Sequence, residues 1–295
     1  MNHLNDQFDL NNDSAYQQWK EQKLEGYPTS IEELIVEIKD PKNLTSSEHE
    51  AMLQRIRKTN MVIFAGPTGD DPDKDIPRQL GAQFGLTSLD NNTGADDDGI
   101  TSLEVKTDQW HKHYIPYTNH QIHWHTDGYY NDLSQQIHAL QLHCVRPAAE
   151  GGENALMDHE IAYILLRDDD PALIEAFMRE DVMTIPENRI DGKVNRPDRA
   201  GPVFMPAPGG ALHMRYTARK RNVVWRGDSV TQQALETLDN ILHSDLHYIY
   251  RGTLQSGQGL ISNNVLHDRS GFNDDGEAPR LLYRLRYYDR VSESG

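Results

Sequence analysis

Cysteine is almost absent from this chain of 295 residues, which contains only Cys144. A disulfide within the chain is therefore excluded, and a reducing compartment is the natural location, so we expect a cytoplasmic protein. We expect Cys144 to be a small buried side chain in a strand. No run of about 18 apolar residues occurs, which predicts no membrane span. The N-terminus lacks the basic start and apolar segment of a signal peptide.

Positive charge is scarce as well. The chain has 29 lysines and arginines against 46 aspartates and glutamates, a formal net charge of -17. This charge repels phosphate backbones, so we expect a small-molecule substrate and no nucleic-acid partner. The absence of a glycine-rich dinucleotide or phosphate loop argues against nucleotide-dependent enzymes. Some of the basic residues form two clusters, 215–226 and 280–290, which either receive an anionic small molecule or lie on solvated strand edges.

Helix signals concentrate in the first 60 residues and in the middle of the chain. Asp13 or Ser14 can cap a helix that runs through Leu24, and Thr45 with Glu48 forms a capping box for a second helix. Further helices are predicted over 159–167, from 171 onward, and over 231–243, the last with a clear apolar face.

Strand signals dominate from residue 120 onward. Leu140, Leu142 and Cys144 alternate with other residues at a period of two, as in a strand with two distinct faces. Other short strands are predicted over 61–65, 182–185, 203–205, 212–217, 259–262 and 280–288. Short strands with glycine-rich turns, decorated by helices, predict a mainly β fold with added helices, built on a jelly roll.

The segment 85–118 has little periodicity and contains a run of Asn, Asp and Gly residues. A loop of this length inside a compact enzyme is usually functional or disordered, so we interpret it as a lid. His111 and His113 near its end are candidates to close over a substrate, and an inert surface insertion is the alternative.

Two His-x-Asp triplets are candidates for metal binding, His125-Thr126-Asp127 and His243-Ser244-Asp245. Alternate residues of a strand point to the same face, so the first triplet and His123 can share one side. Residues two apart on a helix diverge by about 200°, so the second triplet, at a predicted helix end, cannot chelate one ion. Gly128 suits a tight bend after the first triplet, which is the better candidate.

Two histidines and one carboxylate form a set that binds iron(II) and leaves coordination positions open. The first triplet needs a histidine from elsewhere, and His267 is the best candidate because it follows the predicted strand at 259–262. Arg280 and Arg284 would share one face of the last strand, where a guanidinium can hold a carboxylate with two parallel bonds. A polar sheet face exposed to water is the alternative for these arginines.

The order of these motifs resembles the taurine dioxygenase-like (TauD/TfdA) family of iron(II)- and 2-oxoglutarate-dependent oxygenases. The resemblance extends from about residue 30 to the C-terminus, and its specific blocks are 124–128, 147–154, 257–269 and 280–284. It implies a double-stranded β-helix core (jelly roll, clavaminate synthase-like) at 120–290. The core would belong to a single catalytic domain, 1–295, with an N-terminal helical elaboration at 1–60 and the lid at 85–118.

The resemblance also implies roles for individual residues. His125, Asp127 and His267 would bind iron, and Arg280 would bind the distal carboxylate of 2-oxoglutarate. Asn154, where relatives often have threonine, would bind the same carboxylate. Substrate contacts are expected from His123, Tyr129, Tyr130 and Arg284, the last facing either the inner carboxylate of the cosubstrate or an anionic group of the substrate. Gln258 also departs from the family pattern, and we expect it to be structurally neutral.

The implied reaction oxidises an unactivated C–H bond with O₂ and converts 2-oxoglutarate to succinate and CO₂. Asp127 fills a position that related halogenases leave open for chloride, which favours hydroxylation, with desaturation as a variant. The uneven charge favours a small polar or zwitterionic substrate. No residue resembles a dedicated general base, so no catalytic residue is expected beyond the metal centre.

Three other functions remain open from the sequence. A cupin-type metalloprotein would use His123 and His125 as its first ligands, but it needs a glutamate a few residues on and leaves Arg280 without a task. A non-catalytic sensor would keep the barrel without turnover. A zinc hydrolase would lack a convincing base. The resemblance leaves the formation of homo-oligomers open, because relatives are often dimers or tetramers.

Overall fold

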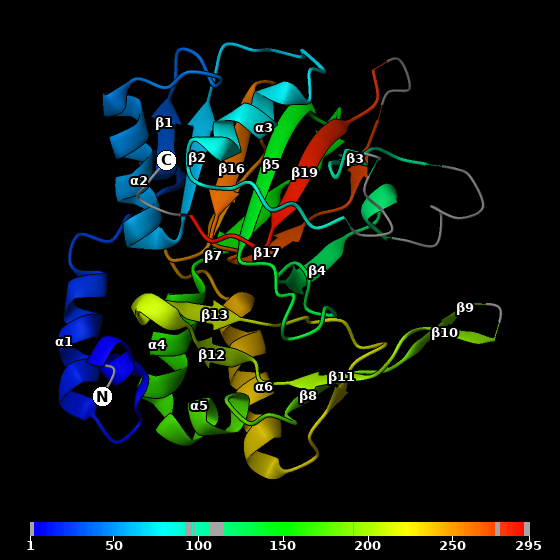
Figure 1. Ribbon diagram of the computed structural model, residues 1–295. Coiled ribbons are helices and arrows are strands. Elements are labelled where there is room, and N and C mark those ends of the chain that lie inside the picture. The colour runs from blue at the N-terminus through cyan, green and yellow to red at the C-terminus, as the bar shows by residue number, and fades with distance from the viewer. Residues whose placement is uncertain are drawn as a thin grey trace. The chain divides into compact units, whose positions relative to one another are not determined.

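Helices dominate one part of the chain and strands dominate the other in the computed structural model, which describes residues 3–91, 96, 98–106, 115–190, 192–274 and 278–291. The chain divides into two compact units (Figure 1). The first unit comprises Met1–Tyr27, Trp124–Gln136 and Met157–Ile249, and the second comprises Pro28–His123, Ile137–Leu156 and Tyr250–Gly295. None of the described helices combines the length and apolarity that crossing a bilayer requires.

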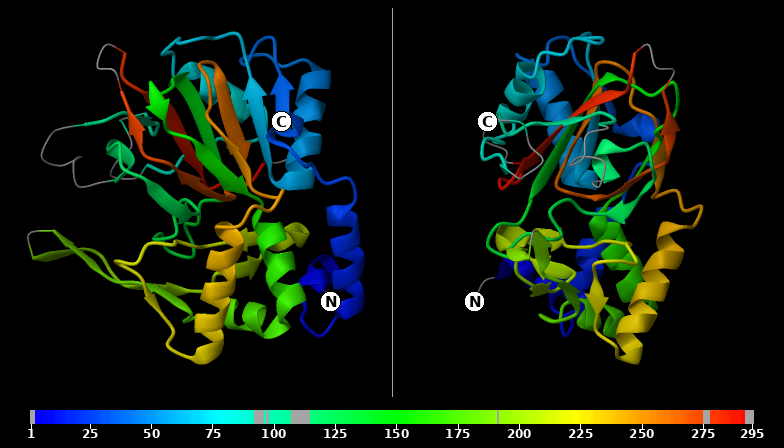
Figure 2. Two further views of the ribbon diagram at one scale, coloured as in Figure 1. Left: turned by 180° about the vertical axis from the view of Figure 1, so that it is seen from behind. Right: turned by 90° about the vertical axis from the view of Figure 1, so that its right-hand side faces the viewer.

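The first unit consists of helices and small sheets (Figures 1 and 2). Its helices are η1 (His3–Phe8), α1 (Asp13–Leu24), α4 (His159–Asp169), α5 (Pro171–Phe177), η5 (Pro208–Gly210) and α6 (Ser229–Leu242). Its strands form the sheets β11-β8-β14, β12-β13 and β10-β9. Their bounds are β8 (Met183–Ile185), β9 (Asn188–Ile190), β10 (Lys193–Arg196), β11 (Arg199–Gly201), β12 (Phe204–Pro206), β13 (Leu212–Met214) and β14 (Val224–Trp225).

Capping residues determine where the helices of the first unit begin. The side chains of Asp158, Asp170 and Asp228 accept hydrogen bonds from backbone N–H groups of the first turns of α4, α5 and α6. A side-chain oxygen at this position satisfies an otherwise unpaired amide. At α1 the cap is Asn12, so the predicted cap at Asp13 or Ser14 is one or two residues late.

A buried ionic cluster ties α1 to the start of α4. The Lys23 ammonium lies 2.7 Å from Asp158 and 2.5 Å from Glu160, and the Tyr27 hydroxyl donates to Asp158 at 3.2 Å. Burial alone would lower the pKa of Lys23, but the two carboxylates raise it above its ordinary value. Lys23 therefore stays charged at neutral pH and holds both helices.

The second unit contains two larger sheets, ordered β1-β2-β16-β5-β19-β3 and β15-β7-β17-β4, and the small pair β18-β6. The strands β4 and β7 begin in this unit and end in the first. Strand bounds are β1 (Ile35–Glu37), β2 (Met61–Ala65), β3 (Thr101–Leu103), β4 (Ile122–His125), β5 (Ala139–Arg146), β6 (Glu150–Gly151), β7 (Asn154–Met157), β15 (Tyr250–Gly252), β16 (Gln258–Ser262), β17 (Leu266–Arg269), β18 (Phe272–Asn273) and β19 (Leu281–Tyr287). Helices are η2 (Ile31–Leu34), α2 (Ser46–Thr59), α3 (Asp75–Ala82) and η4 (Ile115–Tyr117).

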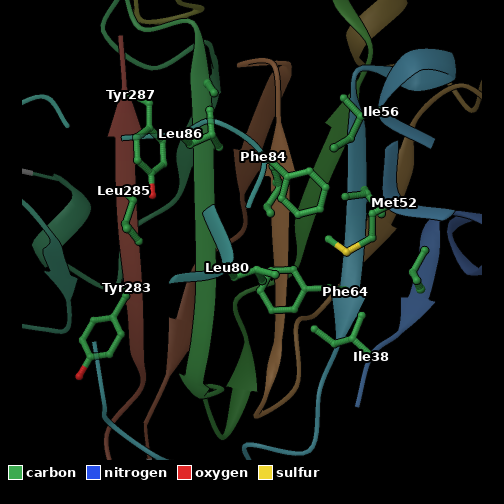
Figure 3. Packing of buried hydrophobic residues seen from close by; sticks show 14 of the residues in the cluster. Ile38, Met52, Ile56, Phe64, Leu80, Phe84, Leu86, Tyr283, Leu285 and Tyr287 are labelled. Carbon is green, nitrogen blue, oxygen red and sulfur yellow. The ribbon is translucent and has the colours of Figure 1, made fainter. Parts of the chain in front are cut away.

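One face of the six-stranded sheet packs against α2 and α3. Phe64 of β2 and Tyr283 of β19 belong to a buried cluster with Met52 and Ile56 of α2 and Leu80 of α3 (Figure 3). Each such apolar side chain contributes about 1.5–3 kcal/mol when buried. The odd-numbered residues of 281–287 line one face of β19, because all four belong to this cluster.

Most predicted elements lie where the sequence places them. The capping box at Thr45 and Glu48 starts α2, and strand 61–65 is β2. Strand 212–217 ends early, at Met214. Parts of the predicted lid, including His111 and His113, lie outside the described residues.

His143 on β5 is fully buried between aromatic rings. Its ring centroid lies 6.0 Å from that of Phe64 and 6.5 Å from that of Tyr283, and both rings are nearly parallel to it. Neither ring nitrogen has a hydrogen-bond partner among the described residues. Burial lowers the pKa of His143 to about 4, although Asp71 partly opposes this shift.

We predict that His143 makes stability depend on pH. The unfolded chain takes up the proton as pH falls through the ordinary pKa of 6.5, whereas the folded chain resists until about 4, so stability falls over this range. The expected loss from this residue between pH 7 and pH 5 is about 2 kcal/mol. Urea unfolding of His143→Phe should show a weaker pH dependence by this amount, and the exposed His243→Phe should not. Equal pH dependence of wild type and His143→Phe would contradict the prediction.

Candidate functional site

The first His-x-Asp triplet lies at the end of β4, in a backbone segment clamped by the segment after β13. The Thr126 N–H donates to the Tyr216 carbonyl at 3.0 Å, and the Ala218 N–H donates to the Trp124 carbonyl at 2.8 Å. An antiparallel bridge joins His125 to Thr217. These bonds fix the backbone on both sides of His125.

The side chains of His125 and Asp127 lie next to each other. His125 Nε2 is 3.4 Å from Asp127 Oδ1, and Asp127 is 5% exposed. The prediction that strand alternation places these two residues on one side is wrong. β4 ends at His125, and Asp127 lies beyond the strand. The chain instead turns at Gly128, whose φ of 69° is readily available only to glycine. A nitrogen and a carboxylate oxygen at this spacing can serve as neighbouring metal ligands.

The second triplet is not a metal site. His243 is the residue that ends α6, and its Nδ1 bonds the Asp239 carbonyl at 2.8 Å. Its side chain is 61% exposed. This confirms the interpretation of His243 as an ordinary histidine at a helix end.

His267 is the second residue of β17 and is buried, with 7% exposure. Its Nδ1 lies 2.9 Å from the Val265 carbonyl. Because a carbonyl only accepts, this bond assigns the proton to Nδ1 and the lone pair to Nε2. Histidine ligands are commonly oriented in this way by a carbonyl behind the ring.

Arg269 braces the chain segment that enters β4. Its guanidinium donates to the Thr118 carbonyl at 2.9 Å and also to the His120 carbonyl, and it lies 4.8 Å from the ring centroid of Phe272. Burial and the charge of Arg280 lower the pKa of Arg269 to about 9. Arg269 thus links β17 to the approach of β4. The sequence interpretation missed it, although its position two residues after His267 is a usable signal.

Arg280 is a buried cation that forms no salt bridge within the described residues, although the charge of Asp274 acts on it. It is 4% exposed, and among the described residues its guanidinium makes no hydrogen bond or salt bridge. Its carbon lies 5.0 Å from the centroid of Phe272, so the ring lies near the guanidinium groups of both Arg269 and Arg280. Burial lowers the pKa of Arg280. A buried, unpaired guanidinium is costly, which suits a site that an anionic ligand completes.

The other two predicted cofactor residues, Arg284 and Asn154, lie on strands of the second unit. Arg284 lies half-buried on β19, opposite Leu142 of β5 and Thr101 of β3. The Asn154 amide donates to the Asp268 carbonyl at 3.0 Å, which joins β7 to β17. Asn154 therefore has a structural task besides the one predicted for it.

The predicted substrate residues differ in exposure. His123 on β4 is exposed, whereas Tyr129 and Tyr130 are half-buried. The ring of Tyr129 meets that of His125 edge-on, with centroids 6.5 Å apart. Tyr129 is therefore the better placed of the three to lie beside the His125–Asp127 pair.

The second unit also contains a cavity of about 230 Å³. Its lining is mostly aliphatic and includes Leu142, Leu156 and Leu260, with Asn154 and Gln258 among its polar members. Cys144 lies buried nearby and donates to the Leu254 carbonyl at 3.3 Å, which confirms the prediction of a buried thiol. Burial raises the pKa of the Cys144 thiol to about 12. The sequence interpretation did not foresee this cavity, because its walls come from distant segments.

Comparisons with known proteins extend over most of the chain. A family model described as "Taurine catabolism dioxygenase TauD, TfdA family" matches residues 23–286. Two curated relatives are uridine-5'-phosphate dioxygenases, from Streptomyces sp (31% identical over 170 residues) and Amycolatopsis sp (29% over 173). These matches cover 55% and 56% of this chain and 59% and 60% of the relatives. The chain thus spans about three fifths of the length of the curated relatives.

Solved structures share the fold at low sequence identity. PvcB from Pseudomonas aeruginosa has a TM-score of 0.58 at 17% identity, covering 86% of this chain and 85% of that one. An asparagine oxygenase in complex with Fe(II), 2S,3S-3-hydroxyasparagine and succinate has a TM-score of 0.52 at 13% identity, covering 84% and 85%.

We predict that Arg280→Met lowers the free energy of unfolding of the ligand-free protein by less than about 1 kcal/mol, because the substitution removes a buried charge that forms no salt bridge within the described residues. The same variant should lose the rise in melting temperature that 2-oxoglutarate gives the wild type, since the anion loses its guanidinium. Thermal unfolding with and without the dicarboxylate measures both effects. Arg251→Met, at an exposed position on β15, is the control and should keep the full rise. A full rise in Arg280→Met would refute the assignment.

Proposed function

The chain belongs to the TauD/TfdA family, and from this membership we propose that it is an Fe(II)- and 2-oxoglutarate-dependent dioxygenase. It would hydroxylate an unactivated C–H bond of a small polar molecule with O₂ and release succinate and CO₂. The observation that carries the proposal is the buried, unpaired guanidinium of Arg280 in a chain with the family's motif order. The family match favours this function over the cupin-type alternative.

The proposed core is the double-stranded β-helix. In support, strands of the two large sheets alternate along the chain except at β7 and β15, which both belong to the four-stranded sheet: β3, β5, β16 and β19 belong to the six-stranded sheet, and β4, β7, β15 and β17 to the four-stranded one. A chain that crosses repeatedly between two facing antiparallel sheets builds a jelly roll. The family match includes residues of both units, which supports one catalytic domain.

We assign the iron to His125, Asp127 and His267. The first two present a nitrogen and an oxygen 3.4 Å apart, and the bond from His267 Nδ1 leaves the Nε2 lone pair for a metal. In the four-stranded sheet, β17 with His267 neighbours β4 with His125. Two imidazoles and one carboxylate suit ferrous iron and leave positions open for other ligands.

We assign 2-oxoglutarate to Arg280, with Arg284 and Asn154 as further contacts. Arg280 offers a complete guanidinium fork for the distal carboxylate, because none of its donors is used by the described chain. Phe272 keeps the fork in place from one side. The fit of a dicarboxylate is electrostatic as well as geometric, since it neutralises a charge that burial destabilises.

Bound iron and 2-oxoglutarate together supply O₂ activation and oxidative decarboxylation. The protein's own part is to hold both and to orient the substrate carbon. Asp127 would hold the metal at the position that chloride would need, so hydroxylation is favoured over halogenation. Tyr129, Tyr130 and His123 are assigned to the substrate side, with Tyr129 nearest to His125.

We propose a cytoplasmic location, which the single cysteine supports, and a small-molecule partner only. The names of the curated relatives add one substrate class to the predicted zwitterions. Both relatives act on uridine-5'-phosphate, so a phosphorylated nucleoside is a second candidate for this chain.

Anaerobic titration with Fe(II) and 2-oxoglutarate tests the assignment. The wild type should develop the visible metal-to-ligand charge-transfer band of an iron–2-oxoglutarate complex, and His125→Ala should not. His243→Ala is the matched control, since it removes the histidine of the other His-x-Asp triplet and should keep the band. The absence of the band from the wild type, or an unchanged band in His125→Ala, would contradict the proposal.

A further inference from the structure

Four arginines of the first unit gather around Tyr129, just after the His125–Asp127 pair; we call Arg196, Arg199, Arg215 and Arg219 the arginine cluster. Arg215 donates to the Tyr129 carbonyl at 2.7 Å and to the Arg199 carbonyl at 2.7 Å. Arg219 donates to the Tyr129 hydroxyl at 3.2 Å. Both ends of Tyr129 are therefore bonded to guanidinium groups.

Arg215 is the buried centre of the cluster. It is 2% exposed, and all its hydrogen bonds go to backbone carbonyls, including those of Met183 and Gly201. Burial lowers its pKa to about 10, and the charge of Arg196 adds to this effect. No carboxylate among the described residues forms an ion pair with Arg215, so its positive charge is not neutralised locally.

The arginine cluster has few carboxylates to balance its guanidinium groups. Arg199 forms the cluster's one ion pair within the described chain, with Asp132 at 3.0 Å. Arg196 bonds only carbonyls, and Asp198 influences it less than Arg199 and the two tyrosines do. Only one of the four guanidiniums forms an ion pair within the described chain, so positive charge exceeds negative charge in the cluster. This is unusual in a chain with a net charge of -17.

Arg219 has the position and the free donors to contact a ligand. It follows Thr217, which bridges to His125, and Ala218, whose N–H bonds the Trp124 carbonyl. Among the described residues its side chain bonds only the Tyr129 hydroxyl, through Nη1. It is half-buried, so Nε and Nη2 can bind an oxyanion that reaches the surface of the first unit.

We propose that the arginine cluster binds the phosphate monoester group of the substrate, with Arg219 as the direct donor and Tyr129 as the residue that orients it. Phosphate is favoured over a carboxylate because it carries close to two negative charges, which balance the unmatched guanidiniums better than one. The inference rests on the proposed function and names its substrate class. It also assigns Tyr129 a role in positioning Arg219 beside the His125–Asp127 pair.

Isothermal titration calorimetry of the protein loaded anaerobically with Fe(II) and 2-oxoglutarate tests this proposal. The probes are uridine-5'-phosphate, uridine and inorganic phosphate. Uridine-5'-phosphate should bind, uridine should bind far more weakly, and inorganic phosphate should compete. Arg219→Gln should raise the dissociation constant of uridine-5'-phosphate about 10- to 100-fold, because a charge-assisted pair is lost.

Arg189→Gln is the matched control, since it removes an exposed arginine of the β9–β10 hairpin that pairs with Glu187. It should bind uridine-5'-phosphate like the wild type. Equal binding of uridine and uridine-5'-phosphate, unchanged binding by Arg219→Gln, or no binding of either phosphate probe would each overturn the proposal. The iron–2-oxoglutarate absorption band is recorded on every sample. Absence of the band from the wild type refutes the proposed function. If the band is present but the phosphate probes do not bind as predicted, only this inference is refuted.

Discussion

The buried guanidinium of Arg280 is the feature on which the rest of the site depends. The described chain surrounds it with Phe272, Gly152 and Cys144, and provides no hydrogen-bond acceptor for its donors. A fold that buries a charge in this way loses stability unless a ligand of opposite charge completes it. If a dicarboxylate binds there as proposed, its binding and the folding of the core would be coupled. The planar fork of arginine, which lysine cannot replace, suits the proposed ligand.

The residues proposed as metal ligands are held by backbone bonds and by neighbours in the sheets. His267 is oriented by the Val265 carbonyl, while His125 is fixed through the bridge to Thr217. Arg269 connects these arrangements, because it lies on the strand of His267 and bonds the segment that leads into the strand of His125. Such supporting bonds orient ligands before a metal arrives, which lowers the cost of binding it.

Local signals in the sequence predicted much of the fold. The capping box at Thr45 and the strand predicted at 280–288 depend on near neighbours, and both were predicted correctly. The signal failed at α3, a short helix in which Gly81 lowers the helix propensity and which packing on the sheet nevertheless stabilises. Arg269 and the aliphatic cavity were missed, because their partners are distant in the sequence. The arginine cluster was visible only in part, since Arg196 and Arg199 join it through tertiary contacts.

The central claim is that three distant side chains hold one ferrous ion beside a dicarboxylate bound by Arg280. The most direct measurement is an anaerobic crystal structure with Fe(II) and 2-oxoglutarate, with diffraction data collected on both sides of the iron absorption edge. The account predicts one anomalous peak bonded to His125, Asp127 and His267, with the distal carboxylate of 2-oxoglutarate on the guanidinium of Arg280. Iron bound elsewhere, or a dicarboxylate that leaves Arg280 without a partner, would contradict it.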